Sequence, residues 1–281
     1  MILVGFGVPV GGKSDDVLVR EREFHDGWAS SVSAGDVAVA AAFESLAAPE
    51  NRFLLSLMGD LRGQRVLDLG SGLGESAIYF ATRGAIVTAT DISPRMCELA
   101  QETARAHGVE IEAVATPVEQ LAVPPGTYDI VYGANLLHHV QDVEGALAAV
   151  ERALKPGGRC FFWDPLAYNP AINVYRRLAT GVRTTDEHPL TFEIIAQLRR
   201  RFVDVGHREF WLSTLALFVK YYFVDRLDPN QVRYWKRILE EDPARIGWWF
   251  RPLQALDSVL LRLPLLRRLA WNIAVWGTKP A

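Results

Sequence analysis

The ten residues from Val66 to Glu75 (Val-Leu-Asp-Leu-Gly-Ser-Gly-Leu-Gly-Glu) constrain the fold more than any other part of this chain. An aliphatic run ends in a turn with glycine at every second position, and a helical pattern follows from Ser76. Glycine allows a sharp turn and lets a ligand approach main-chain N–H groups. The helix N-terminus behind the turn adds a partial positive charge. The run therefore predicts a strand–turn–helix cradle for a nucleotide-type ligand; the alternative is a turn that binds nothing.

The spacing of these glycines bears on the kind of ligand. A dinucleotide fingerprint needs G-x-G-x-x-G, whereas here the third glycine, Gly74, comes one residue early and Glu75 stands in its place. A nicotinamide-dependent oxidoreductase is therefore a poor match. Asp68 and Glu75 would also repel a pyrophosphate, so the loop favours a ligand with a cationic end and an amino group.

A second acidic residue follows the next predicted strand, Ile86–Asp91, about twenty residues later. A carboxylate at that position accepts hydrogen bonds from both ribose hydroxyls of adenosine-containing ligands. The alternative is that Asp91 belongs only to the N-terminal cap region of the helix at 93–107.

Strands and helices alternate through the middle of the chain. Strands are predicted at Arg65–Leu69, Ile86–Asp91, near Ile111–Val114, at Tyr128–Ala134 and at Arg159–Trp163, with helices at 74–83, 93–107 and 142–153. This alternation is typical of an α/β protein with a doubly wound parallel sheet.

The middle of the chain holds four motifs, one after the other: Val66–Gly74, Ala89–Met96, Tyr128–Val140 and Leu154–Phe162. On these residues the chain resembles the class I S-adenosylmethionine-dependent methyltransferases, of the small-molecule type with a Leu-His-His motif after the fourth strand. The resemblance covers roughly residues 60 to 164. It implies a Rossmann-like seven-stranded sheet and S-adenosyl-L-methionine as the cofactor.

The resemblance also implies roles for individual residues. Asp68 would orient the cofactor's amino group and Asp91 would hold its ribose. Beside the methionine part and the transferable methyl would lie Gly70, Ser71, Gly72, Leu73, Asn135 and Leu136, and against the adenine Ile92 and Met96.

One position departs from the family pattern. Relatives usually carry an aspartate after the third strand that accepts a bond from the adenine amino group, and Pro117 stands there. Proline offers neither a side-chain acceptor nor an N–H donor. The adenine would then depend on Val118, Glu119 or Thr116, or on apolar packing alone.

The C-terminal part predicts a helix at 191–199, a sixth strand at Val205–Trp211 and a last, antiparallel strand at Ala270–Gly277. A short hairpin commonly joins such strands, but about sixty residues intervene here, and so long a connection is usually structured or functional. The predicted units are an N-terminal helical cap (1–60), the cofactor-binding core (61–211), a helical apolar lid (212–269) and the last strand (270–281).

The predicted lid is rich in large apolar and aromatic residues. Between Leu253 and Leu263, apolar residues recur every three or four positions, which is typical of an amphipathic helix that ends at Pro264. The stripe either docks the insertion on the sheet's helices or roofs the acceptor site. Arg262, Arg267 and Arg268 beside it also permit shallow peripheral contact with a membrane.

Candidates for the acceptor side come from three places. In the N-terminal segment Phe24 and Trp28 share a helix face, and one of them or His25 is expected at the active-site mouth, whereas 37–46 is expected to be a packing helix. His138 and His139 follow strand four, at the edge where ligands bind, and titrate near neutrality; they are catalytic candidates, although His139 could merely bond a neighbouring backbone group. Further candidates are Tyr168, Tyr175 and His188.

Composition and charge limit the remaining alternatives. Residues 1–150 hold 9 Lys and Arg against 20 Asp and Glu, whereas 151–281 hold 21 against 13. The basic half is read as solvated helix faces or as attraction to an anionic substrate or a membrane surface. The basic pairs are dispersed, so nucleic acid is not expected as a partner.

No transmembrane span, secretory signal, metal or disulfide framework is indicated, and Met1–Val10 is expected to be a flexible or surface-packed end. A cytoplasmic enzyme is the natural expectation.

The sequence predicts a methyltransferase acting on a small, largely hydrophobic acceptor, such as a secondary metabolite, quinone-like or lipid-like molecule. Transfer needs chiefly proximity and orientation, with a histidine base where the acceptor must lose a proton. Oxygen, nitrogen or carbon remains open as the acceptor atom. The alternatives are a catalytically silent methyltransferase-like binding protein and a methyltransferase acting on a macromolecule.

Overall fold

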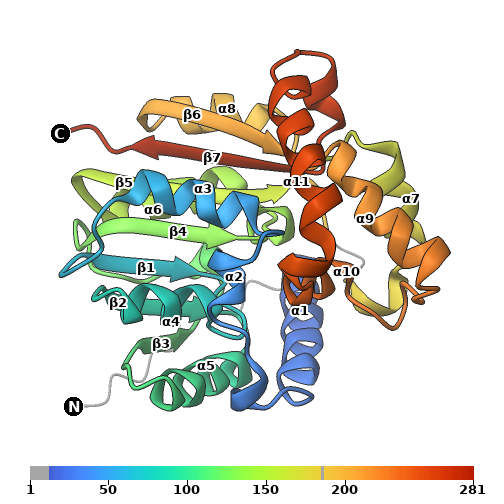
Figure 1. The fold of residues 1–281 in the computed structure, drawn as a ribbon. Coiled ribbons are helices and arrows are strands. Elements are labelled where there is room, and N and C mark those ends of the chain that lie inside the picture. Colours follow the sequence, from blue (N-terminus) through green and yellow to red (C-terminus); the bar gives the residue numbers. More distant parts are fainter. Residues whose placement is uncertain (1–12, 185–186) are drawn as a thin grey trace.

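The computed structural model describes residues 13–184 and 187–281 and contains one seven-stranded sheet (Figure 1). The strands run in the order β3-β2-β1-β4-β5-β7-β6, and β7 runs antiparallel to both of its neighbours, β5 and β6. Their bounds are β1 Arg65–Leu69, β2 Ile86–Asp91, β3 Glu112–Ala115, β4 Tyr128–Ala134, β5 Leu154–Pro165, β6 Val203–Phe210 and β7 Asn272–Thr278. The predicted fold class and antiparallel last strand are confirmed.

Alternate residues of the strands enter two different hydrophobic clusters. Tyr132 and Phe161 pack into one cluster, whereas their neighbours Val131 and Phe162 pack into the other. Because successive side chains of a strand point to opposite faces, both faces of the sheet are buried. The result is a three-layer arrangement of helices, sheet and helices.

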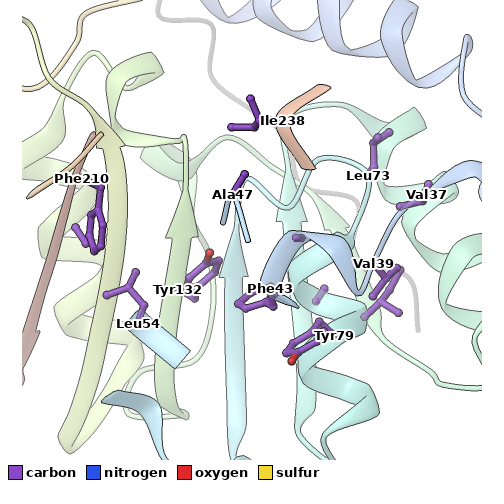
Figure 2. Packing of buried hydrophobic residues seen from close by; sticks show 14 of the residues in the cluster. Val37, Val39, Phe43, Ala47, Leu54, Leu73, Tyr79, Tyr132, Phe210 and Ile238 are labelled. Atoms are coloured by element: carbon purple, nitrogen blue, oxygen red, sulfur yellow. The ribbon is translucent and has the colours of Figure 1, made fainter. Parts of the chain in front are cut away.

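Eleven α-helices are seen in the described residues. Their bounds are α1 Lys13–Ala29, α2 Ala41–Glu44, α3 Pro49–Met58, α4 Glu75–Thr82, α5 Pro94–Ala106, α6 Val143–Ala153, α7 Pro170–Leu178, α8 Glu193–Arg199, α9 Ala216–Val219, α10 Tyr234–Arg237 and α11 Pro243–Leu260. Helices α2 to α5 contribute to the first cluster, and α6 and α8 to the second. Figure 2 shows the first, in which Phe43 of α2 stacks on Tyr79 of α4 with ring centroids 4.3 Å apart.

The helices outside the alternating core gather at one end of the sheet. In Figure 1 the parallel strands point towards α1, α10 and α11, so the N-terminal helix and the insertion between β6 and β7 lie beyond their carboxyl ends. Ligands of open α/β sheets bind at this edge.

Two local predictions are wrong. The segment 37–46 was expected to be a packing helix, but only Ala41–Glu44 is helical. In the insertion the helix begins at Pro243 and includes Pro252, and most of the predicted apolar stripe is exposed rather than docked. Ile246, Phe250 and Asp257 form its buried side instead.

A third difference concerns β5, which begins at Leu154 rather than Arg159. Leu154 already pairs with Tyr128, and the register shifts before Arg159 pairs with Ile130. The Lys-Pro-Gly-Gly stretch at 155–158 is therefore incorporated into the strand as an irregularity.

Three further points complete the fold. The expectation for Met1–Val10 lies outside the described residues. Cys97 and Cys160 are buried free thiols. In the parts of the chain that the structure describes, no helix has the length and apolarity needed to cross a bilayer.

Candidate functional site

The glycine turn after β1 forms one wall of a large cavity. Gly70 has φ +61°, and a Cβ there would lie 2.7 Å from Leu136 Cδ1. Gly74 has φ +86°, and a Cβ there would lie 2.7 Å from Ala100 Cβ. Both positions therefore require glycine because of backbone conformation and packing. Gly72 (φ +54°) has open space where a side chain would be, as a backbone that a ligand approaches must have.

Asp91, at the end of β2, ties this turn to the next one. Its Oδ2 accepts a hydrogen bond from Gly72 N at 2.9 Å and its Oδ1 accepts one from Ser93 N at 2.9 Å. Ser93, not Asp91, caps α5 by accepting from Met96 N. Asp91 also lines the cavity, and burial raises the pKa of its carboxyl, opposed by the charge on His25. The structure therefore places Asp91 at the cavity wall, and its contact with a ribose stays a prediction.

Most of the residues assigned to the adenine, but not Met96, line the cavity. They are Ile92 after β2 and Thr116, Pro117, Val118 and Glu119 after β3. Pro117 directly precedes the 3₁₀ turn Val118–Gln120, and its ring belongs to the wall. We call this part of the cavity, between the glycine turn and Pro117, the cofactor lobe.

The end of β4 brings the Leu-His-His motif to the cavity. Asn135 adopts φ +52°, which is uncommon for a residue other than glycine, and its N–H donates to Trp163 O at 2.8 Å. This kink leads directly into the 3₁₀ turn Leu137–His139. Asn135, Leu136, His138 and His139 all line the cavity as a result.

His138 is held by a buried carboxylate. Its Nδ1 lies 2.8 Å from Asp164 Oδ1, which also accepts from the His138 N–H at 3.2 Å. Burial lowers the pKa of His138 well below 6.5, and the positive charges of His139, Arg183, Arg176 and His25 lower it further. Burial raises the pKa of Asp164 to about 7. His138 is therefore a neutral imidazole at neutral pH.

His139 approaches a carboxylate from α1. Its Nδ1 lies 3.3 Å from Glu21 Oε2, and His25 Nε2 lies 3.6 Å from the same oxygen. Although burial alone would raise the pKa of Glu21, the imidazoles of His139 and His25 hold it well below its ordinary value. Glu21 is thus an anion that can orient His139 and stabilise its protonated form. This is the arrangement that a general base needs.

A third carboxylate completes the polar part of the cavity. Glu187 Oε2 lies 4.0 Å from His138 Nε2 and forms an ion pair with Arg183. Ligand atoms of His138, His139 and Glu187 lie within 4.8 Å of one another, close enough to hold a metal ion. Arg183 is the cation that contacts Glu187 in the described structure.

The cavity is roofed by contacts between α1 and α10. We define the roof as Trp28, Trp235 and Lys236. The two indoles meet edge to face with centroids 5.6 Å apart. Lys236 forms an ion pair with Glu75 in the first turn of α4, and the Arg233 guanidinium lies 4.6 Å from the Trp28 ring centroid. The roof therefore joins the N-terminal helix and the insertion above the glycine turn.

A second lobe lies at the ends of β5, β6 and β7. Its walls are largely aromatic and small apolar side chains, and we call it the acceptor lobe: Ala47, Ala48, Glu50, Trp163, Trp211, Trp271 and Asn272. The rings of Trp211 and Trp271 are 5.6 Å apart. One cavity thus combines a nucleotide-type cradle with an apolar compartment, and the His138–His139 turn contributes to its wall.

Most predicted site residues meet in this cavity, including Phe24, His25 and Trp28 of α1. Met96 and Tyr175 are buried elsewhere, whereas Tyr168 stacks on Phe192 and His188 is exposed. None of these four lines the cavity. Their expected contacts with cofactor or acceptor have no support in the geometry.

Asp68 lies below the glycine turn and does not line the cavity either. Both carboxylate oxygens are buried, and the groups that stabilise their charge are the Ser76 hydroxyl and the Ala77 N–H in the first turn of α4. Burial raises the pKa of Asp68 to about 8, and the nearby negative charges of Glu75 and Asp91 add to that shift. The contact of Asp68 with the amino group of a methionine-type ligand, directly or through water, stays a prediction.

Sequence reasoning did not single out Glu21, Asp164 or Glu187 as site residues. A signal for Glu21 was present: it stands four residues before His25 and seven before Trp28, so all three share a helix face. Asp164 and Glu187 become significant only through contacts with the Leu-His-His turn.

Comparison with known proteins agrees with this geometry. A family model described as "Methyltransferase domain" matches residues 67–162. A ubiquinone biosynthesis O-methyltransferase of Bordetella avium is 35% identical over 158 residues, which cover 53% of this chain and 65% of that protein. The chain thus spans slightly less than two thirds of this curated relative.

Solved structures share the fold. A phosphoethanolamine N-methyltransferase 2 of Haemonchus contortus matches with a TM-score of 0.59 and 18% identity, over 98% of this chain and 62% of that one. An S-adenosylmethionine-dependent methyltransferase of Mesorhizobium loti matches with a TM-score of 0.55 and 21% identity, over 84% and 100%. Sheet order, glycine turn, acidic β2 end and family match agree: the chain carries a class I S-adenosylmethionine-dependent methyltransferase domain.

Proposed function

We propose that the protein transfers the methyl group of S-adenosylmethionine to a small, largely hydrophobic molecule. The observation that carries this proposal is one continuous cavity in which the cradle of Gly72 and Asp91 opens into a compartment walled by Trp163, Trp211 and Trp271. Ligand cavities are typically apolar with a few well-placed polar groups, and this compartment has that character. A quinone-like, lipid-like or other secondary metabolite would fit it.

The cofactor, when bound, supplies an activated methyl group on a sulfonium sulfur. The protein's part is chiefly to hold the reacting atoms in line, because correct proximity and orientation lower the barrier to transfer. Gly70, Gly72 and Asp91 would fix the cofactor, and the walls of the acceptor lobe would orient the acceptor.

His139 would remove the proton from an acceptor hydroxyl as its oxygen forms the new bond to carbon. Glu21 at 3.3 Å would stabilise the resulting imidazolium. A base of this kind favours oxygen as the acceptor atom, because a hydroxyl must lose its proton during transfer. The ubiquinone relative is named as an O-methyltransferase, which supports the same atom.

A catalytically silent binding protein is the alternative that Pro117 keeps open, because the side chain offers the adenine no hydrogen bond. A macromolecular acceptor has less support, since the roof of Trp28, Trp235 and Lys236 joins α1 to the insertion across one side of the cavity.

The test is methyl transfer from labelled S-adenosylmethionine to a panel of aromatic and lipid-like phenols, alcohols and amines. The proposal predicts labelled product from at least one apolar acceptor and a large loss of turnover in His139→Gln. Tight cofactor binding with no transfer to any member would favour the silent alternative. Transfer only to RNA or protein would contradict the small-molecule assignment.

A further inference from the structure

Glu50 is an unusual feature of the acceptor lobe. It lies in the first turn of α3, is only 4% exposed, and nevertheless lines the cavity. Its Oε1 accepts a hydrogen bond from Asn272 Nδ2 at 2.6 Å. Asn272 begins β7 and lines the same lobe. A carboxyl and an amide are thus fixed together at the end of the sheet.

No ion pair to Glu50 is seen within the described part of the chain, although the nearby charge of Arg52 opposes the rise in the pKa of its carboxyl. The neighbouring Arg52 donates to Leu46 O instead. Burial raises the pKa of Glu50 to about 7, and the hydrogen bond from Asn272 opposes that shift. A buried carboxylate without a charged partner is costly. A cation brought by a ligand would remove that cost.

Asp257 shows what a purely structural carboxyl looks like in this protein. It is also buried, but it accepts hydrogen bonds from the N–H groups of Leu212, Ser213 and Thr214 and from two hydroxyls. Those donors belong to the turn that follows β6, which Asp257 therefore holds in place. Glu50 faces a cavity, and in the described structure its side-chain donors are only Asn272 and, more weakly, the Trp211 indole.

The surroundings of Glu50 also suit a cation. Trp163, Trp211 and Trp271 line the same lobe, and the negative faces of indole rings attract ammonium groups, most strongly where water is excluded. The Trp163 Nε1 donates to Asn51 Oδ1 at 2.5 Å, which ties that indole to the residue beside Glu50. The carboxyl and the aromatic walls thus form a compartment in which Glu50 is the one charged side chain of the acceptor lobe as defined above.

We propose that Glu50 binds a protonated amine on the methyl acceptor, with Asn272 as the residue that positions its carboxyl. The acceptor is then an amphipathic amine: an aromatic or aliphatic body lies between the tryptophans, and the ammonium group forms an ion pair with Glu50. This inference deepens the proposed function and rests on it, since it assigns the substrate class of the same cavity.

The test uses the full-length protein saturated with S-adenosylhomocysteine and two matched probes, 2-phenylethylamine and 2-phenylethanol. They differ in charge but little in shape, and their binding is followed by tryptophan fluorescence. We expect the wild type to bind the amine at least tenfold more tightly than the alcohol. Glu50→Gln should lose at least tenfold for the amine and leave the alcohol unchanged. Glu98→Gln, an exposed carboxyl on α5 paired with Arg95, is the matched control.

Equal binding of amine and alcohol by the wild type would overturn the inference, whether or not the variant folds. Equal losses of affinity for both probes in Glu50→Gln would show that Glu50 contacts a neutral donor group and does not recognise the ammonium charge. This result would also contradict the inference. Binding of S-adenosylhomocysteine distinguishes a failure of the Glu50 inference from a failure of the proposed function. If the wild type fails to bind it, the proposed function falls and the inference with it; if it binds and the probes do not discriminate, only the inference falls.

Discussion

Lys236 of the insertion forms an ion pair with Glu75 in the first turn of α4, directly behind the glycine turn. The two residues are 161 positions apart in the chain, and both line the cavity. The pair therefore connects the roof to the cofactor cradle. Its loss is expected to loosen the wall of the cradle.

Lys236→Met should accelerate dissociation of S-adenosylhomocysteine by up to about fivefold, because a partly exposed ion pair contributes on the order of 1 kcal/mol. Stopped-flow displacement measures this rate. Lys220→Met removes a comparable pair with Asp225 away from the cavity and should leave the rate unchanged. A similar change of the dissociation rate in both variants would show that the Lys236–Glu75 pair has no specific effect on ligand release.

His139→Gln should lower kcat by roughly 10² to 10⁴, the usual contribution of general base catalysis, while S-adenosylhomocysteine binds as before. Glu21→Gln should lower kcat less, since it only orients and stabilises His139. His107→Gln, at the end of α5 and outside the cavity, is the control. Unchanged kcat in His139→Gln would mean that the acceptor loses its proton without this residue.

Asp68 should make the stability of the unliganded protein depend on pH. Its pKa is about 8 in the folded protein against an ordinary value of 3.8, so the folded state binds the proton more tightly than the unfolded chain does. The stability associated with Asp68 is therefore present at low pH and is lost as pH rises towards 8.

Asp68→Asn removes this dependence. Its melting temperature should exceed that of the wild type by a few degrees at pH 8, and the difference should shrink towards pH 5. Thermal unfolding followed by circular dichroism measures both values. A difference that stays constant with pH would show that the carboxyl is not held protonated.

The strands of the cofactor lobe could be predicted closely. The bounds of β1, β2 and β4 agree with the sequence prediction, because each is a short, buried apolar run that ends at a glycine, an acidic residue or an asparagine. The glycine turn and Asp91 follow directly from those ends. This part of the site depends on local sequence and on a sheet order common to such folds.

The acceptor lobe could not be predicted in the same way. Glu50 meets Asn272 across 222 residues, and Glu21 meets His139 only because α1 lies across the ends of the strands. Such contacts depend on how separate segments pack, which periodicity does not encode.

The stripe at Leu253–Leu263 illustrates the same limit. Its spacing identified an amphipathic helix but not the side that the protein buries. The helix buries Ile246, Phe250 and Asp257, whereas Val259 is 59% exposed.

The central claim is that the cavity binds S-adenosylmethionine through Asp91, and calorimetric titration with S-adenosylhomocysteine tests it most directly. Micromolar binding by the wild type, lost by at least tenfold in Asp91→Ala and retained in the exposed-loop control Asp60→Ala, is the predicted result. No binding by the wild type, or equal binding by Asp91→Ala, would contradict the account at its base.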